Sequence, residues 1–264
     1  MLACTDLCAQ YRGGPRVLGP LSLACTPARV TAIIGPNGAG KSTLLRALLG
    51  TLEPTAGAVT LDSQPLATFT PAQRAARIAY VAQRPTLAAP MDVRRVVELG
   101  RHARGPSPAI IDAALEALGL TRDAHRPLGE LSTGQQQRVS LARALAQLTT
   151  APASATDDLA GTTLLADEPI SAMDPAHALR ALALLHNMAR RGCAVLIVMH
   201  ELTLALAHAD DAALLSCDGT LAASGAVSDV LTPQRLGPVY GLRFVREGRA
   251  LTPTLEPEAS AVRP

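Results

Sequence analysis

The stretch GPNGAGKST, residues 35–43, matches the pattern G-x-x-x-x-G-K-[ST]. The apolar run VTAII at 30–34 precedes it, and a segment with helical spacing follows at 42–49 until Gly50 stops it. Glycines let successive backbone N–H groups turn toward phosphate oxygens, and a helix N-terminus adds partial positive charge there. The stretch therefore predicts an α/β fold of the phosphate-loop NTPase class, with a RecA-like core.

Two side chains of this loop have specific tasks in holding a triphosphate. Lys41, the only lysine in the chain, supplies a point charge for the β- and γ-phosphates, and the Ser42 hydroxyl suits Mg²⁺. A plain glycine-rich turn is the alternative, but it does not explain the strand before the loop and the helix after it. The residues expected to bind nucleotide here are Gly35, Pro36, Asn37, Gly38, Ala39, Gly40, Lys41, Ser42 and Thr43.

A second apolar run, at 163–166, predicts a buried strand that ends in two carboxylates, Asp167 and Glu168. ATP hydrolysis needs one carboxylate to hold the metal and another to orient and deprotonate the attacking water. Such a strand end is weak as a signal by itself, and it becomes much stronger downstream of a phosphate loop. We expect Asp167 at the metal and Glu168 facing the water.

The segment LSTGQQQRVSLARALA at 131–146 predicts a helix with Ser132 as its N-cap and one apolar face. Capped helices are common, so the pattern by itself is compatible with a purely structural role. The stretch nevertheless resembles the LSGGQ signature of ABC ATPases, a motif that other phosphate-loop enzymes lack.

The remaining motifs of that family follow in the family's order. Gln83, after a strand-like run at 78–82, resembles the Q-loop glutamine, and SAMD, ending at Asp174, resembles the D-loop. His200 directly follows an apolar run and resembles the switch histidine, although a lone histidine there would usually be structural. Tyr11 stands where the family has an adenine-stacking aromatic, with a plain surface tyrosine as the alternative.

The resemblance covers about residues 2–245 and implies an ATP- and Mg²⁺-dependent hydrolase that works as a head-to-tail pair of copies. Each nucleotide would lie between the phosphate loop of one copy and the signature of the other. The implied catalytic residues are Glu168, His200 and Gln83; the implied metal ligands are Ser42, Gln83 and Asp167; and the implied nucleotide contacts beyond the loop are Tyr11, Ser132, Gly134, Gln135 and Asp174.

Three positions depart from the family's pattern. Thr133 replaces the first signature glycine, which restricts the backbone at that point. Ile170 stands where the family has threonine, and Met173 replaces the D-loop leucine, a mild apolar exchange. Because Ser132 and Gly134 remain, we expect activity with an altered nucleotide affinity.

Strand, turn and helix signals divide the chain into one ATPase domain with an insertion. The runs at 2–9 and 17–23, joined by a Gly-Gly-Pro turn, predict an N-terminal antiparallel β region. Residues 84–147 predict an inserted α-helical subdomain, and there is no internal repeat. We expect a single domain at 2–245 and a loosely held tail at 246–264.

Composition limits the possible partners. The net charge is +2, and the 24 lysines and arginines are scattered, which argues against a nucleic-acid surface. The apolar run at 194–199 is far shorter than the ~20 residues that span a bilayer, and the N-terminus lacks the basic start of a signal peptide. We therefore expect the chain to stay in the cytosol. The resemblance implies a peripheral protein at the cytoplasmic face of the inner membrane, bound to two transmembrane permease subunits.

The cargo is indicated only by likeness. Residues 224–241 are similar to the ending of iron-chelate, haem and cobalamin importer ATPases, and the loop at 149–162 looks most like the haem-importer branch. The resemblance implies the energy-coupling subunit of a hemin importer, which would meet an external substrate-binding protein only indirectly. Siderophore, cobalamin and metal-ion importers remain alternatives.

Two further readings belong to other classes. A soluble ABC ATPase acting on DNA or ribosomes would need a long coiled-coil insertion or a second ATPase module, but Leu131 follows Gly35 by only 96 positions. A subunit that binds ATP without hydrolysing it is disfavoured by the presence of Lys41, Glu168 and His200.

Overall fold

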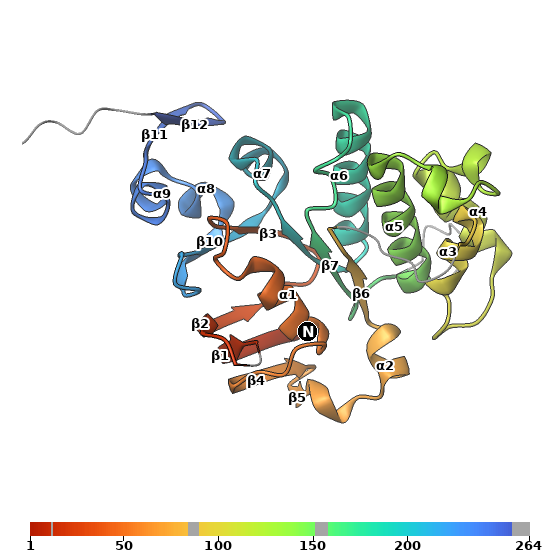
Figure 1. The fold of residues 1–264 in the computed structure, drawn as a ribbon, viewed down its shortest axis with the longest axis horizontal. Helices are drawn as coiled ribbons and strands as arrows, with labels where there is room; N and C mark the ends of the chain where they lie inside the picture. The colour runs from red at the N-terminus through yellow and green to blue at the C-terminus, as the bar shows by residue number, and fades with distance from the viewer. Residues whose placement is uncertain (12, 84–89, 151–157, 255–264) are drawn as a thin grey trace, which may run out of the picture.

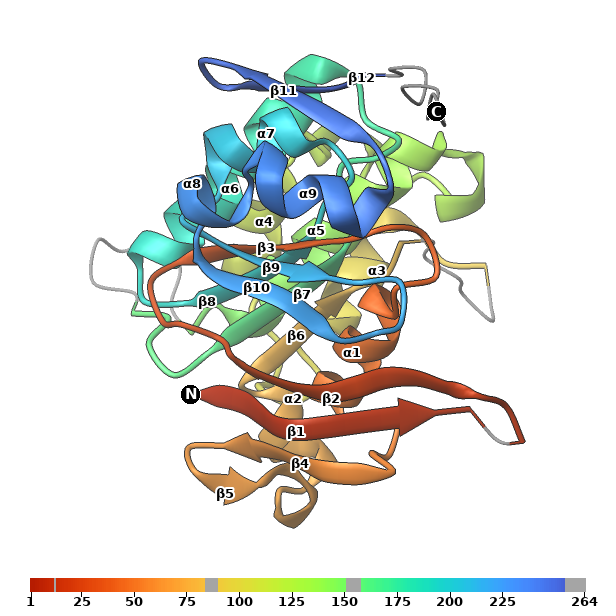
Figure 2. The same cartoon turned by 90° about the vertical axis from the view of Figure 1, so that its left-hand side faces the viewer.

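The fold is a six-stranded sheet and a four-stranded sheet with α1, Lys41–Leu49, between them. The computed structural model describes residues 1–11, 13–83, 90–150 and 158–254. Figures 1 and 2 show the two sheets and the helices around the larger one. The six-stranded sheet has the order β10-β9-β3-β8-β7-β6, formed by Leu221–Ala226, Asp211–Leu215, Val30–Ile34, Ala194–Val198, Thr163–Asp167 and Ile78–Val81.

The central strands of the larger sheet pair in parallel and are buried on both faces. All five residues of β3, β7 and β8 are buried, as their continuous apolar runs predict. Alternate side chains enter two different apolar clusters. Ile33 and Leu165 point toward α1 and the smaller sheet, whereas Ala32 and Leu164 point toward the helices on the other face.

The smaller sheet is antiparallel throughout and confirms the predicted N-terminal β region. It has the order β2-β1-β4-β5. Figure 2 shows it below the larger sheet, with α1 between the two. In chain order its strands are β1 (Leu2–Gln10), β2 (Arg16–Ala24), β4 (Ala56–Leu61) and β5 (Gln64–Pro65).

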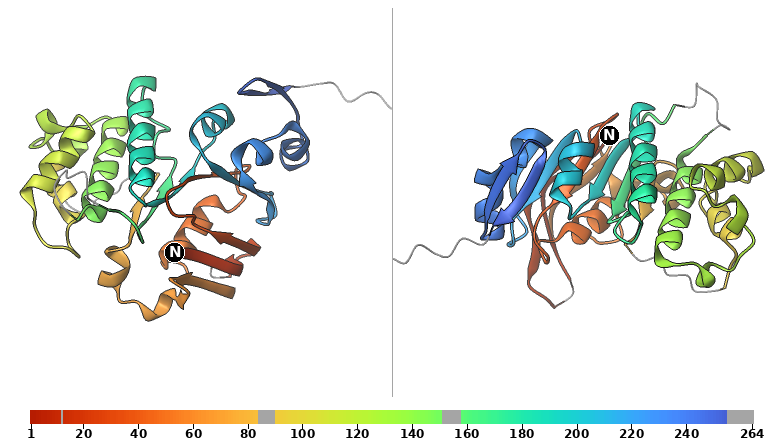
Figure 3. Two further views of the ribbon diagram at one scale, coloured as in Figure 1. Left: turned by 180° about the vertical axis from the view of Figure 1, so that it is seen from behind. Right: turned by 90° about the horizontal axis from the view of Figure 1, so that it is seen from above.

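Three helices pack together at one end of the molecule, as both views of Figure 3 show. These are α3, α4 and α5 (Val93–Leu99, Pro108–Ala117 and Thr133–Leu148), and they fall within the range expected to be helical. Residues 105–106 lie between α3 and α4, and residues 126–127 lie between α4 and α5. Residues 84–89, at the start of the expected insertion, lie outside the described residues.

The other helices are mostly short, apart from α6. Pro71–Ala75 forms α2, and three single 3-10 turns lie at Leu66–Thr68, Thr121–Asp123 and Leu128–Glu130. Within the described ranges, no helix is both long and apolar enough to cross a membrane. After β7 the chain forms α6, α7, α8 and α9, at Pro175–Arg190, Leu202–His208, Val227–Val230 and Pro233–Tyr240.

The expected loose tail from residue 246 is wrong for residues 246–254. Arg243–Glu247 (β11) and Ala250–Thr254 (β12) form an antiparallel hairpin. Phe244 and Leu251 are buried, and the Leu251 N–H donates to Thr203 Oγ1 on α7 at 3.3 Å. The hairpin is anchored because its alternate apolar side chains reach the core. Neighbouring arginines obscure this alternation in the sequence. Residues 255–264 lie outside the described residues.

Arg101 ties the end of α3 to the end of α5. Its side chain is 6% exposed, and its guanidinium donates to the carbonyl oxygens of Ala146 at 3.1 Å, Thr149 at 2.6 Å and Gly105 at 3.1 Å. Burial lowers the pKa of Arg101. The guanidinium of Arg101 therefore supplies a hydrogen-bond donor to each of these three carbonyl groups.

Arg101→Met is expected to lower the free energy of unfolding by about 2–4 kcal/mol, because buried acceptors would lose their donor. Urea denaturation followed by circular dichroism measures the change. Arg95→Met is the control: Arg95 is exposed and makes one ion pair with Glu98, so its loss should cost under about 0.5 kcal/mol. Equal losses for the two variants would contradict the role given to Arg101.

Candidate nucleotide site

The loop between β3 and α1 exposes the helix N-terminus. Gly38 and Gly40 have left-handed φ angles of 83° and 85°. A Cβ at Gly40 would come within 2.4 Å of Leu18 Cδ2 and 3.0 Å of the Val17 carbonyl oxygen, and together with the left-handed φ this favours glycine there. Gly40 caps α1 without a side-chain hydrogen bond, which leaves the N–H groups of the first turn for an anionic ligand.

Lys41 folds back over this loop. Its ammonium group donates to the carbonyl oxygens of Gly35 at 2.7 Å and Pro36 at 2.9 Å, and the residue is 7% exposed. Burial lowers the pKa of Lys41, and the nearby carboxylates of Glu168 and Asp167 partly oppose that shift. The predicted phosphate-binding cation therefore lies in the loop, close to both predicted carboxylates.

Asp167 ends β7 with a buried carboxylate, 4% exposed. Burial raises its pKa, and a hydrogen bond from Ser42 opposes the rise. Its Oδ1 atom has no hydrogen-bond partner among the described residues. A buried carboxylate oxygen without a donor, next to a serine hydroxyl, fits the oxygen ligands that Mg²⁺ prefers.

Glu168 lies between two other predicted site residues. Its Oε1 atom is 2.6 Å from His200 Nε2, and its Oε2 accepts from Gln83 Nε2 at 2.9 Å. The three residues follow β7, β8 and β6, whose carboxyl ends share one edge of the parallel sheet. Glu168 also has a left-handed φ of 48°, which is uncommon for a residue other than glycine. The structure thus brings the three predicted catalytic residues together.

Tyr11 stands beside the helix that follows the loop. Its ring is 40% exposed, and its hydroxyl is 3.3 Å from Thr43 Oγ1. Arg46, one turn after Ser42 on α1, donates to the same hydroxyl at 3.2 Å. Sequence reasoning missed Arg46, for which the only signal was a basic residue on the loop's own helix. Stacking of Tyr11 on adenine stays a prediction.

The signature residues lie elsewhere. Ser132 caps α5 through a capping box, in which its Oγ accepts from Gln135 N at 3.3 Å and Gln135 Oε1 accepts from Ser132 N at 2.9 Å. The predicted N-cap is therefore confirmed. Figures 1 and 3 place α5 beside α3 and α4, away from α1. The described hydrogen bonds of Ser132 and Gln135 do not reach the phosphate loop of their own chain.

Asp174 is an exposed cap at the start of α6. It accepts from His177 N at 3.0 Å and pairs with His177 Nδ1 at 2.6 Å, and these hydrogen bonds lower the pKa of Asp174. No described contact joins it to the phosphate loop of its own chain. Its predicted contact with nucleotide therefore stays a prediction.

The fold accommodates the three residues that depart from the family's pattern. Thr133 is the first residue of α5 and helical. Ile170 and Met173 are half-buried and line a hollow of about 430 Å³ that also borders Glu168 and His200. The apolar exchanges therefore extend an apolar surface beside the catalytic pair.

Asp167→Asn is expected to unfold at an equal or higher urea concentration than the wild type at pH 7 without ligand. The fold raises the pKa of Asp167, so the ionised carboxylate opposes folding above the unfolded pKa of about 4. The difference should close as the pH falls toward about 4. Asp218→Asn is the control, because hydrogen bonds from Thr220 lower the pKa of Asp218 and the change should have the opposite sign. A clear loss of stability in Asp167→Asn would contradict this account.

The family model described as ABC transporter matches residues 18–151. Hemin import ATP-binding protein HmuV of Bordetella avium (strain 197N) is 40% identical over 237 residues, 88% of this chain and 88% of the relative. The protein of that name from Pseudomonas entomophila (strain L48) is 42% identical over 235 residues, 88% and 89%. A solved ATP-binding subunit of an ABC transporter has a TM-score of 0.75 at 24% identity, over 92% of this chain and 95% of that one, and it shows the fold alone.

Proposed function

Because the chain belongs to the ABC transporter family, we propose that it is the ATP-hydrolysing, energy-coupling subunit of an importer, with hemin as the cargo. The observation that carries the proposal is the carboxylate of Glu168, held between Gln83 and His200 beside a buried lysine and a buried aspartate. Residues 2–245 would act as one ATPase domain with an inserted helical subdomain, and the β11–β12 hairpin packs against the core of that domain.

The phosphate loop would bind the triphosphate of ATP. The free N–H groups at the start of α1 and the ammonium of Lys41 face the β- and γ-phosphates, and Lys41 exchanges its two carbonyl partners for phosphate oxygens. Ser42, Asp167 and Gln83 would hold Mg²⁺, which neutralises charge on the leaving phosphate. Tyr11 would cover the adenine.

Glu168 would act as the general base. Its carboxylate takes a proton from the attacking water, the water oxygen bonds to the γ-phosphorus, and the bond to the β,γ-bridging oxygen breaks to leave ADP and phosphate. Gln83 and His200 already contact the two carboxylate oxygens and hold the group in place. His200, whose Nε2 is 2.6 Å from the carboxylate of this base, would contact the γ-phosphate.

A second copy of the chain would complete each site. Ser132 sits at the N-terminus of α5, whose partial positive charge suits a γ-phosphate, yet its described hydrogen bonds are to Gln135 and Gln136 and none reaches its own phosphate loop. Ser132, Gly134 and Gln135 of one copy would therefore meet the nucleotide held by the other, with Asp174 at the same interface. Loss of the γ-phosphate weakens that contact and lets the pair open.

The cargo is proposed from the relatives, which are named hemin import proteins at about 40% identity. Part of the loop at 149–162, which looked like the haem branch, lies outside the described residues. Siderophore, cobalamin and metal-ion importers are the alternatives. The chelate that stimulates ATP hydrolysis in the reconstituted transporter, with its external binding protein present, decides between them.

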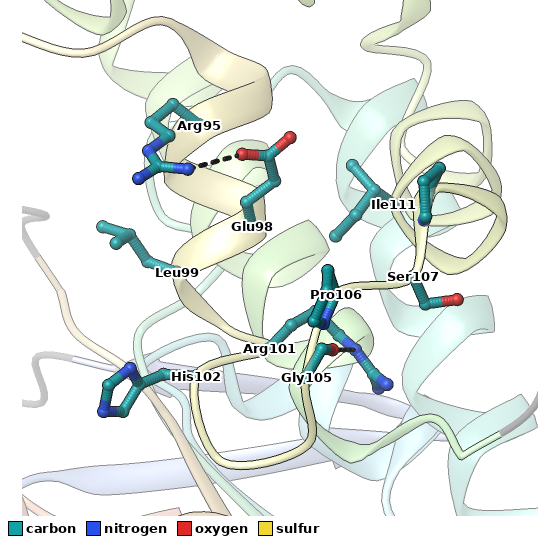
Figure 4. Close-up of a pocket in the computed structure, with 10 residues that line it drawn as sticks. Arg95, Glu98, Leu99, Arg101, His102, Gly105, Pro106, Ser107 and Ile111 are labelled. Atoms are coloured by element: carbon teal, nitrogen blue, oxygen red, sulfur yellow. Dashed lines mark hydrogen bonds and ion pairs between the residues drawn. The ribbon is translucent and has the colours of Figure 1, made fainter.

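Two permease subunits would anchor the pair of copies at the cytoplasmic face of the inner membrane, on the surface around Leu99. This side chain is 41% exposed and borders two hollows, of about 340 Å³ and 360 Å³. Figure 4 shows the first hollow, between α3 and the turn before α4. An exposed leucine between two hollows suits an apolar helix of the permease. Gln83 precedes α3 in the chain, so its movement can pass to this surface.

Glu168→Gln is expected to bind ATP normally and to hydrolyse it roughly 10²–10⁴-fold more slowly, the usual size of a general-base effect. Lys41→Ala should instead lose ATP binding. Phosphate release by the reconstituted transporter and binding of a fluorescent ATP analogue measure the two effects. Unchanged turnover by Glu168→Gln would remove Glu168 from the proposed role.

Leu99→Asp is expected to leave ATP binding by the purified subunit within about 2-fold of wild type, because no described residue lining the two hollows that Leu99 borders belongs to the phosphate loop. It should abolish co-purification with the permease, since a charge would be buried in an apolar contact. Leu242→Asp, which changes a leucine that is 37% exposed and outside both hollows, is the control. Normal co-purification of Leu99→Asp would place the docking surface elsewhere.

A further inference from the structure

Gln137 is a polar side chain buried in the joint between α5 and the loop that follows β7. It is 1% exposed, and both ends of its amide are used. Its Nε2 donates to the Glu168 carbonyl at 3.2 Å and to Ser171 Oγ at 3.1 Å, and its Oε1 accepts from Ala172 N at 3.1 Å. Every one of these bonds goes to the same short loop, which carries the proposed base at its start.

The carbonyl of Glu168 is the centre of this network. Besides Gln137, it accepts from Ser171 N at 3.3 Å and from Ser171 Oγ at 3.1 Å. Glu168 has a left-handed φ of 48°, a conformation that is strained in a residue with a side chain and persists only when its surroundings enforce it. The three donors fix the peptide that follows Glu168 and so hold this backbone conformation.

The helix α5 also packs tightly against this loop at Gly134, about one turn before Gln137. A Cβ added at Gly134 would come within 2.5 Å of the Ala172 carbonyl oxygen, so backbone lies directly against backbone. Gln137 and Gly134 are on the same side of α5, three residues apart. The loop from Glu168 to Ala172 is thus pinned to the helix at two successive points.

We propose that Gln137 is a positioning residue for ATP hydrolysis, which holds the backbone of Glu168 so that its carboxylate stays aimed between Gln83 and His200. The inference rests on the proposed function, because it assumes that Glu168 is the base. Gln137 bonds to no part of the phosphate loop, so it acts on turnover and leaves nucleotide binding alone.

Gln137→Met tests this, because methionine has a similar length and neither polar end. In the reconstituted transporter we expect kcat to fall about 10–10²-fold while KM for ATP changes by less than about 2-fold. Gln136→Met is the matched control. Gln136 is the neighbouring residue on α5 and donates to the carbonyls of Leu128 and Leu131, so kcat should stay within about 2-fold of wild type.

A double-mutant cycle separates positioning from a general loss of structure. If Gln137 acts through Glu168, adding Gln137→Met to Glu168→Gln should produce almost no further loss of kcat. Additive losses would overturn the inference. Normal kcat in Gln137→Met, with Glu168→Gln slow, would overturn this inference alone, whereas normal kcat in Glu168→Gln would overturn the proposed function itself.

Ser171→Ala provides a second test that spares the buried core, in case Gln137→Met fails to fold. Ser171 is exposed, and its hydroxyl links Gln137 to the Glu168 carbonyl. We expect a fall in kcat of about 2–10-fold with ATP binding retained. No change in kcat would count against the network as a device for holding Glu168.

Discussion

The parallel pairing of β6, β7 and β8 is the constraint on which the site depends. Asp167 lies opposite Val198 in register, and the carboxyl ends of the three strands meet at one edge of the sheet. Gln83, Glu168 and His200 each follow one of these strands within two residues, so pairing alone brings them together. A shift of register in any one strand would separate the glutamate from its two partners.

The same edge holds groups that oppose folding without a ligand. Burial shifts the pKa values of Lys41 and Asp167 in the directions that disfavour their charged forms, and Glu168 has an uncommon backbone conformation. Apolar clusters on both faces of the sheet stabilise the fold and offset the cost of these buried charges and of this backbone conformation. Phosphate oxygens and a divalent cation would satisfy the charges at the places where the protein leaves them unmatched.

Local patterns predicted the parts of the fold that depend on local structure. The run at 30–34 is β3, Gly50 ends α1, and Ser132 caps α5, because each signal lies within a few residues of the feature. The contacts of Gln137 escaped sequence reasoning, since its partners lie more than 30 residues away and only packing brings them near. The hairpin after residue 243 was missed because charged residues mask its alternation.

The proposed pair of copies requires that the Ser132 tip of one copy closes on the nucleotide held by the other. Light scattering of Glu168→Gln measures this directly: with Mg²⁺ and ATP the protein should have about twice the mass of the 27.3 kDa chain, and with ADP the mass of one chain. Adding Ser132→Arg should keep it monomeric while ATP still binds. Dimerisation of that double variant with ATP, or the same mass with ATP and ADP, would contradict the account.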